Sequence, residues 1–292
     1  MNHTCPWCTS KNTHLHLMLK DYFLTQEPFE IVQCEDCGLL FTVPRPAPDA
    51  IGRYYKSEVY FSHQENNKGF IPRVYESVKS INMRHKVALA TSGLSKGKLL
   101  DIGCGVGDFI HSVECAGWQC VGIEPSADAI TIAQQRVHAE ILSLVDLSSL
   151  DDGMFDVITM WHVLEHVDDL HSEIVQLHRL LKPGGRLVVA VPNYCSYDAD
   201  YYQDRWAAYD VPRHLNHFSK RVLFSILQSS GFVFDSFDKL QWDAFYISYM
   251  SEKSVGHSLP LVRGFFTGLR SNLKARKTGE WSSLVYVFHR EK

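Results

Sequence analysis

The sequence has 292 residues, 45% of them hydrophobic and 21% charged, so it is long enough for one large domain with a small appendage and is not typical of a disordered chain. Lys and Arg number 29 and Asp and Glu number 33, and the resulting net charge of −4 argues against a general nucleic-acid binder. Because no apolar run reaches the roughly 18–20 residues that span a bilayer, and the start MNHTCPWC lacks the basic and apolar regions of a signal peptide, we expect a cytoplasmic protein.

Two Cys-x-x-Cys pairs lie near the N-terminus, at Cys5 with Cys8 and at Cys34 with Cys37. Each pair directs two thiolates at one centre, and together they form the four-thiolate set of a structural zinc site. Two unrelated pairs or a redox dithiol are the alternatives, but two such pairs rarely coincide in so short a segment. Four protein ligands leave no open position, so we predict a structural Zn²⁺ and no catalytic role for it.

The segment around these cysteines is expected to be a zinc ribbon over residues 1–45. Short strands are predicted at Phe29–Gln33 and Leu39–Val43, on either side of the second pair. A unit this small cannot build its own core and is expected to need the metal to fold. The other four cysteines lie among apolar segments, where a free cysteine behaves as a small hydrophobe: Cys104, Cys115, Cys120 and Cys195.

Residues 46–97 are predicted to form a linker and N-terminal helices. The stretch Val43–Asp49 is rich in proline and indicates a domain boundary. Asp49 is placed to cap a short helix that ends near Tyr55. From Phe70, apolar residues recur at helical spacing, and this second helix is expected to end near Gly93.

From Lys98 onward, predicted strands and helices alternate along the chain. The first four strands are expected at Lys98–Ile102, Gln119–Glu124, Ala139–Leu144 and Met154–Met160. Helices are expected at Gly107–Ala116 and Ala127–Val137. This β-α-β-α order predicts an α/β fold with a doubly wound, mostly parallel sheet that binds its ligand at the carboxyl ends of the strands.

One helix is predicted after the fourth strand, because apolar residues from Leu164 to Leu181 fall on a single face. Lys182-Pro-Gly-Gly185 is expected to stop this helix, and Arg186–Val191 is predicted to be the fifth strand.

The turn after the first strand reads Asp101-Ile-Gly103-Cys-Gly105-Val-Gly107, and its glycines allow a close approach of backbone to ligand. A dinucleotide-binding turn would need a third glycine at position 108, which is Asp108, so a dehydrogenase is disfavoured. An acidic residue leading into the turn suits a cationic ligand better than a pyrophosphate. Glu124 ends the next strand, where a carboxylate can accept both hydroxyls of a ribose.

The chain resembles a class I S-adenosylmethionine-dependent methyltransferase over about residues 70–292. It is most similar to a bacterial branch, that of the type 11, 12 and 23 methyltransferases, whose signature corresponds here to Phe155–His166, Lys182–Gly185 and Pro212–Phe218. Several members of that branch, including sugar C-methyltransferases, also have an N-terminal zinc ribbon. The resemblance implies a Rossmann-like seven-stranded sheet with Phe232–Leu240 and Leu284–His289 as its last strands, the final one antiparallel.

The resemblance also implies which residues bind S-adenosylmethionine. Asp101 and the turn through Gly103, Cys104, Gly105 and Gly107 would hold its methionine end, and Glu124 its ribose. Pro125 and Ser126 would line the adenine side, with Asp146 and Leu147 beside the adenine. Trp161 and His162 would lie near the methyl-bearing sulfur.

Three histidines are candidates for a base that deprotonates the acceptor: His166, His214 and His217. His166 is expected to form local hydrogen bonds at the start of the helix. His214 and His217 follow the fifth strand, where they either contact the acceptor or hold the loop. The neighbouring aromatic residues suggest either an acceptor wall or plain packing: Tyr194, Tyr197, Tyr201, Tyr202, Trp206 and Tyr209.

Residues Gln241–Trp281 are expected to be an insertion before the last strand of a methyltransferase domain over residues 98–292. The insertion mixes aromatic residues with Arg263, Arg270, Lys274, Arg276 and Lys277. Such a segment either forms a solvated face beside a substrate cap or makes peripheral contact with a membrane or a lipid-linked substrate.

We therefore expect methyl transfer to an oxygen or carbon of a small-molecule acceptor, which would be a sugar, a quinone-like compound or a lipid-linked metabolite. An RNA-modifying methyltransferase is one alternative, but the negative net charge and the scarcity of cations between Cys5 and Cys37 oppose it. A non-catalytic interaction module is another, which the intact glycine turn and Glu124 oppose.

Overall fold

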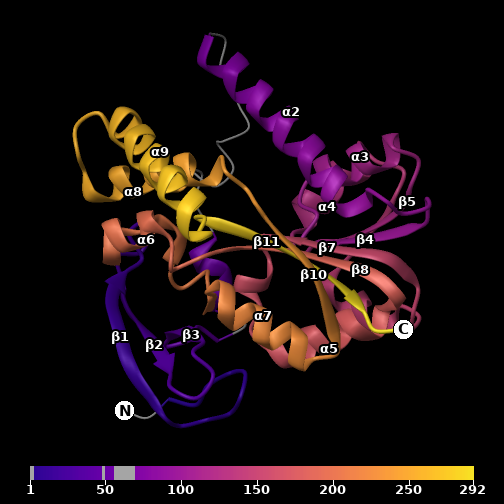
Figure 1. The fold of residues 1–292 in the computed structure, drawn as a ribbon, viewed down its shortest axis with the longest axis horizontal. Coiled ribbons are helices and arrows are strands. Elements are labelled where there is room, and N and C mark those ends of the chain that lie inside the picture. The colour runs from indigo at the N-terminus through magenta and orange to yellow at the C-terminus, as the bar shows by residue number, and fades with distance from the viewer. Residues whose placement is uncertain (1–2, 48–49, 56–69) are drawn as a thin grey trace.

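The computed structural model describes residues 3–47, 50–55 and 70–292. A seven-stranded sheet has the order β10-β11-β8-β7-β4-β5-β6. Figure 1 shows this sheet between two layers of helices. Its strands are β4 (Lys98–Ile102), β5 (Gln119–Ile123), β6 (Glu140–Leu142), β7 (Phe155–Trp161), β8 (Leu181–Pro192), β10 (Phe232–Lys239) and β11 (Ser283–Arg290). Six of these strands run in the same direction, and β11 runs antiparallel to its neighbours β8 and β10. The expected doubly wound sheet and its antiparallel last strand are confirmed.

Helices cover both faces of this sheet. One face carries α2 (Phe70–Thr91), α3 (Asp108–Cys115) and α4 (Ala127–Gln134), and the other carries α5 (Leu170–Leu180) and α7 (Lys220–Ser229) (Figure 1). Because both faces are covered, the central strands are almost continuously buried, as in β8, where Leu187 to Val191 have no exposed side chain. The strand β4 is the first of this sheet along the chain, and the glycine turn begins at its carboxyl end.

A second, four-stranded sheet joins the N-terminal segment to the rest of the chain. It contains β1 (Thr13–Lys20), β2 (Pro28–Cys34), β3 (Leu40–Val43) and β9 (Asn216–His217), paired antiparallel in that order. The sequence indicated β2 and β3 but not β1, whose side chains are mostly exposed. The fourth strand comes from the histidine-containing segment more than 170 residues later in the chain. The ribbon is therefore built into the fold rather than appended to it.

The predicted helix from Leu164 to Leu181 is wrong at both ends. A short 3₁₀ turn, η4 (Leu164–His166), is followed by a break, and α5 begins only after Asp169, whose side chain accepts a hydrogen bond from Ser172 N. Val163 and Val167 have non-helical backbone, so the apolar spacing crosses a bend. Leu181 already belongs to β8, and the segment Lys182–Gly185 lies inside that strand and not before it.

The remaining helices lie at the ribbon end of the molecule. They are α6 (Tyr197–Tyr202) and the hairpin of α8 (Asp243–Val255) and α9 (Pro260–Thr278), which forms the insertion (Figure 1). None of the described helices has the length and apolar character that crossing a membrane requires. Before α2, a 3₁₀ turn covers Ile51–Tyr54, and Asp49, its expected cap, lies outside the described residues.

Candidate functional site

The glycine turn between β4 and α3 adopts a conformation that side chains disfavour. Gly103, Gly105 and Gly107 have φ angles of 73°, 53° and 83°. A Cβ at Gly103 would lie 2.3 Å from a methyl group of Val163, so the backbone there is in direct contact with the end of β7. A Cβ at Gly105 would meet nothing within 4 Å, so the middle of the turn leaves room for a ligand.

Glu124 fixes the geometry of this turn. Its carboxylate follows β5 and is 8% exposed; Oε2 accepts a hydrogen bond from Gly105 N at 2.9 Å and Oε1 one from Ser126 N at 3.0 Å. Ser126 in turn caps α4, and Pro125 between them is exposed. A carboxylate can accept about four hydrogen bonds, so Glu124 keeps acceptor capacity for a ligand.

Asp101, at the end of β4, is a buried acid. It is 2% exposed and accepts a hydrogen bond from Thr159 Oγ1 at 2.6 Å. Burial raises the pKa of Asp101 to about 7, even though Thr159 and the Lys86 ammonium act in the opposite direction. Because a cation beside it would restore its charge, this position favours a positively charged ligand. Lys86, which comes from α2, was not anticipated from the sequence.

Trp161 and His162 close the site from the end of β7. Trp161 packs edge-on against Phe109, with ring centroids 5.4 Å apart, and Lys86 Nζ lies 4.7 Å from its ring. Trp161 Nε1 is buried and has no hydrogen-bond partner among the described residues. A buried indole N–H usually has a partner, so this donor is available to a ligand.

His162 lies between two carboxylates. Its φ of 59° turns the ring so that Nε2 is 2.9 Å from Asp243 Oδ2 and Nδ1 is 3.3 Å from Glu165 Oε1. Burial lowers the pKa of His162, but the two acids outweigh burial and raise it to about 9. His162 is therefore a cation at neutral pH. Asp243 begins α8, so the insertion contributes directly to this site, which the sequence did not indicate.

Asp146 and Leu147 lie in a short 3₁₀ helix, Leu144–Ser149, after β6. Asp146 Oδ2 accepts hydrogen bonds from Ser143 N and Oγ, and Leu147 is 6% exposed. The strand β6 neighbours β5, so the structure places both residues at the same edge of the sheet as Glu124.

Glu165, His166 and His214 form a compact polar group. One ligand atom from each lies within 4.8 Å of the others, and His166 and His214 meet edge to face with centroids 4.5 Å apart. His166 Nδ1 is 2.9 Å from the Arg213 carbonyl, and His214 Nδ1 is 2.8 Å from the Ala208 carbonyl. A carbonyl only accepts, so each Nδ1 carries a proton and Nε2 is the atom at which each ring can accept one.

Burial and neighbouring charges set the charge states of His166 and Glu165. Burial, together with His214, lowers the pKa of His166 to about 4, so this ring is neutral at pH 7. Burial raises the pKa of Glu165, but the neighbouring His162 imidazolium outweighs burial and holds that pKa below its usual value, so the acid stays charged. Glu165 is 1% exposed, and its Oε1 is paired with His162 Nδ1 at 3.3 Å. The Nε2 atoms of His166 and His214 and the carboxylate of Glu165 are groups that can accept a proton or ligate a divalent cation.

His217 does not belong to this group. Its Nε2 lies 2.9 Å from Thr42 Oγ1, and the same hydroxyl donates to the His214 carbonyl at 2.7 Å. Burial lowers the pKa of His217 well below its usual value. Of the three candidate bases, the structure thus brings His166 and His214 together and places His217 against the ribbon.

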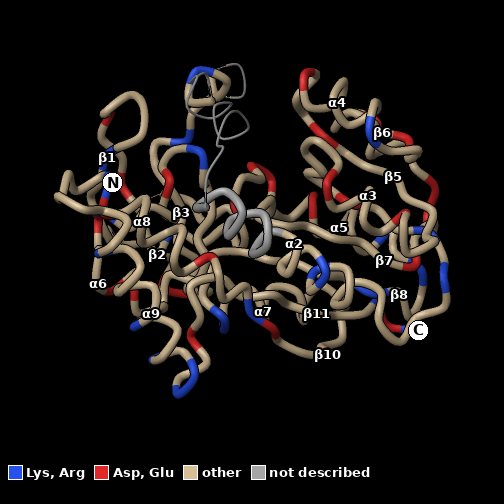
Figure 2. The backbone as a smooth tube through the Cα atoms, turned by 90° about the horizontal axis from the view of Figure 1, so that it is seen from above, with Lys and Arg blue, Asp and Glu red and all other residues tan. Residues whose placement is uncertain are grey.

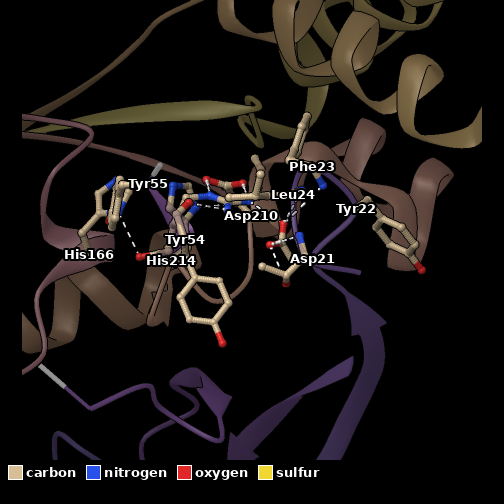
Figure 3. Close-up of polar contacts among 12 residues, drawn as sticks. Asp21, Tyr22, Phe23, Leu24, Tyr54, Tyr55, His166, Asp210 and His214 are labelled. Atoms are coloured by element: carbon tan, nitrogen blue, oxygen red, sulfur yellow. Dashed lines mark hydrogen bonds and ion pairs between the residues drawn. The ribbon is translucent and has the colours of Figure 1, made fainter. Parts of the chain in front are cut away.

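A buried ion pair also joins the ribbon to the histidine segment (Figure 3). Arg213 Nη2 donates to Asp21 Oδ1 at 2.9 Å and to Asp210 Oδ1 at 2.6 Å, and Nη1 donates to the Tyr54 carbonyl at 3.0 Å. The Arg213 and Asp21 side chains are 3% and 0% exposed. Tyr55, beside this network, has its hydroxyl 3.1 Å from His166 Nδ1. The ribbon therefore positions the residues on both sides of His214.

The aromatic residues after β8 mostly serve this interface. Tyr202, Trp206 and Tyr209 are 2–6% exposed and share a core with ribbon residues such as Leu19 and Leu40. Tyr201 is 49% exposed, and Tyr194 and Tyr197 are half-buried. Packing against the ribbon is thus the main role of Tyr202, Trp206 and Tyr209.

The four N-terminal cysteines converge on one centre. Cys5 Sγ lies 3.6 Å from Cys37 Sγ, and Cys8 Sγ lies 3.5 Å from Cys34 Sγ, with all four sulfurs within 4.8 Å of one another. A metal bound tetrahedrally at about 2.3 Å from each sulfur would separate the sulfurs by about 3.8 Å, which this arrangement fits.

Comparison with known proteins agrees with this architecture. A family model described as "Methyltransferase domain" matches residues 78–236. The mitochondrial ubiquinone biosynthesis O-methyltransferase of Rattus norvegicus is 26% identical over 211 residues, covering 66% of this chain and 60% of its own length. The enzyme of that name from Glaesserella parasuis is 34% identical over 131 residues, covering 39% of this chain and 56% of its own. The chain thus spans about 60% or less of the length of these relatives.

Solved structures share the fold at low sequence identity. A cyclopropane synthase from Mycobacterium tuberculosis has a TM-score of 0.52 and 15% identity, covering 81% of this chain and 95% of its own. The family model covers more than half of the chain, and the sheet order and glycine turn agree with it. The chain therefore belongs to the methyltransferase-domain family, among the class I S-adenosylmethionine-dependent methyltransferases.

Proposed function

We propose that this protein transfers a methyl group from S-adenosylmethionine to a hydroxyl oxygen of a small, quinone-like acceptor. The observation that supports this most is the group of Glu165, His166 and His214 at the carboxyl end of β7, beside the predicted cofactor turn. Relatives named ubiquinone biosynthesis O-methyltransferases support the acceptor class. Methyl transfer to a carbon atom or to a sugar is the alternative, and the acceptor panel described below distinguishes it from transfer to a quinone-like hydroxyl.

The residues at the carboxyl edge of the sheet fit the cofactor chemically. The open face of Gly105, the fixed carboxylate of Glu124 and the buried acid Asp101 match a ligand that has a cationic end and ribose hydroxyls. When bound, S-adenosylmethionine supplies an electrophilic methyl group on a sulfonium leaving group. We assign Pro125, Ser126, Asp146 and Leu147 to the adenine side and Trp161 to the pocket wall.

The protein's own contribution is alignment, exclusion of water and removal of one proton. A hydroxyl acceptor must lose its proton as the new oxygen–carbon bond forms, and Nε2 of His166 or His214 would accept that proton. Glu165 would stabilise the resulting imidazolium. His162 is already protonated, so we assign it to orienting Glu165 and Asp243 and not to proton removal.

Calorimetric titration with S-adenosylmethionine and S-adenosylhomocysteine tests the cofactor assignment, and one-to-one micromolar binding is expected. Transfer of labelled methyl to a panel of catechol-type quinone precursors and nucleotide sugars then tests the acceptor. His166→Gln and His214→Gln should each lower turnover at least about 100-fold and leave cofactor affinity unchanged. His138→Gln, at an exposed position, is the matched control. Labelling of sugars alone, or full turnover in both variants, would contradict the proposal.

We further propose that Cys5, Cys8, Cys34 and Cys37 bind a structural zinc ion. The supporting observation is the mutual distance of their sulfurs. Metal analysis of the purified protein should give one zinc per chain, and a value near zero in folded protein would contradict this assignment.

A further inference from the structure

The helix α9 is packed with its small residues inward. Gly264, Gly268, Ser271 and Ala275 are buried. Ser271 Oγ donates a hydrogen bond to Asp198 Oδ1 of α6 at 2.6 Å, so the inward side of α9 faces α6 as well as α8. A Cβ at Gly264 would lie 2.6 Å from Tyr249 Cα, and one at Gly268 would lie 2.8 Å from Phe245 Cα. The backbones of α8 and α9 are therefore in close contact, as in helix pairs that meet through small residues. No large side chain of α9 fits between the two helices.

The large apolar side chains of α9 consequently face outward. They are between 38% and 59% exposed: Leu261, Val262, Phe265, Phe266, Leu269 and Leu273. Tyr246 of α8, at 55%, and Leu259 of the connecting loop, at 69%, extend the same surface. Single exposed apolar residues are ordinary, but a continuous stripe along a 19-residue helix indicates an interaction surface. We call this stripe the apolar face of α9.

The charged residues of α9 itself are all positive. The helix α9 has Arg263, Arg270, Lys274, Arg276 and Lys277 and no acidic residue. Residues 241–281 have six basic and three acidic side chains, a sum of +3 in a chain whose net charge is −4. One of those acids, Glu252, is 1% exposed and paired with Arg263 and His257. Figure 2 shows the blue segments of this region at the lower left, near α9.

This combination identifies one kind of partner. A helix with a bulky apolar face bordered by Lys and Arg lies flat in the interface of an anionic bilayer, where apolar burial and attraction to the lipid headgroups act together. A second copy that packed its own α9 against this face would bring two positively charged borders together, and repulsion between like charges disfavours this arrangement.

We infer that the α8–α9 hairpin docks on an anionic lipid surface through the apolar face of α9. The hairpin begins at Asp243, whose carboxylate contacts His162, so docking would bring the candidate site to the membrane surface. The inference does not depend on the acceptor or on catalysis, because binding to vesicles is measured without turnover.

Sedimentation with phosphatidylcholine vesicles, with and without phosphatidylglycerol, tests this inference on the full chain. The protein should bind the anionic vesicles at least about tenfold more tightly, and salt should weaken the binding. The double variant Phe265→Ser with Phe266→Ser should lose about tenfold or more in affinity, because each ring contributes apolar burial. Arg270→Gln with Arg276→Gln and Lys277→Gln should abolish the preference for anionic lipid.

The matched control changes exposed apolar residues elsewhere. Met18→Ser with Val175→Ser, at positions 64% and 52% exposed, should leave vesicle binding unchanged. Failure of the protein to bind either vesicle would overturn the inference, as would equal binding to neutral and anionic vesicles. Light scattering is the second measurement: a dimer that the Phe265 and Phe266 changes convert to a monomer, without vesicle binding, would assign the face to a second copy.

Discussion

Replacing Asp21 by Asn tests whether the ribbon holds the histidine segment in place. Asp21 is 1% exposed, and its two oxygens accept five hydrogen bonds, from Arg213, Phe23, Leu24 and both donors of Thr25. The amide removes the charge that faces Arg213 and turns an NH₂ donor towards other donors. Removing one partner of a buried ion pair costs about 3–5 kcal/mol, and because Arg213 keeps Asp210, we expect about 3 kcal/mol.

That loss translates into a measurable shift of the melting temperature. For 292 residues at about 2.1 cal/mol/K per residue, the entropy of unfolding is about 0.6 kcal/mol/K, so Tm should fall by about 5 °C at pH 7. Burial raises the pKa of Asp21, but Arg213 and the surrounding donors outweigh it and hold the pKa below its ordinary value. The stabilisation by Asp21 is therefore present above about pH 3.9 and is lost as the pH falls through the lowered pKa.

Calorimetric unfolding at pH 7, 4 and 3 provides the assay. The Tm difference between the wild type and Asp21→Asn should be largest at pH 7 and should shrink at pH 3. Asp36→Asn, an exposed change in the same ribbon, should shift Tm by no more than about 1 °C. A shift for Asp21→Asn no larger than that of this control, or a difference that persists undiminished at pH 3, would refute the reasoning.

Three further predictions concern the two sites. Glu124→Ala should weaken S-adenosylmethionine binding at least about tenfold by calorimetry, because it removes the acceptor of Gly105 N, whereas Glu140→Ala should not. The imidazole of His162 should titrate by NMR near pH 9. The stability that its charge provides is therefore complete below about pH 6.5 and is lost as the pH rises through about 9. Asp243→Asn should lower the midpoint of this titration, and an unchanged midpoint would contradict the ion pair. Cys34→Ser should abolish zinc binding and reduce hydrogen-exchange protection in β2 and also in Asn216–His217, while β4 stays protected. Loss of protection confined to the ribbon would contradict the pairing of β9 with the ribbon strands.

The order of strands and helices from Lys98 to Val191 was predictable because it depends on local sequence. Apolar runs of strand length, glycines with positive φ and capping residues act within a few positions of one another. The same local signals indicated the glycine turn, Glu124 and the four cysteines. Where local spacing continued across a bend, as from Leu164 to Leu181, the prediction was wrong, because periodicity does not record backbone direction.

The composition of the candidate site was decided by tertiary structure. Asp243 contacts His162 from 81 positions away, and Thr42 contacts His217 across 175 positions. Lys86 of α2 lies over the ring of Trp161 in β7. Such contacts cannot be predicted from the spacing of residues in the sequence, because they form only when the fold brings distant segments together. The outward apolar face of α9 has the same origin: the sequence contains its residues and charges, but only the close packing of Gly264 and Gly268 against α8 determines which side faces the solvent.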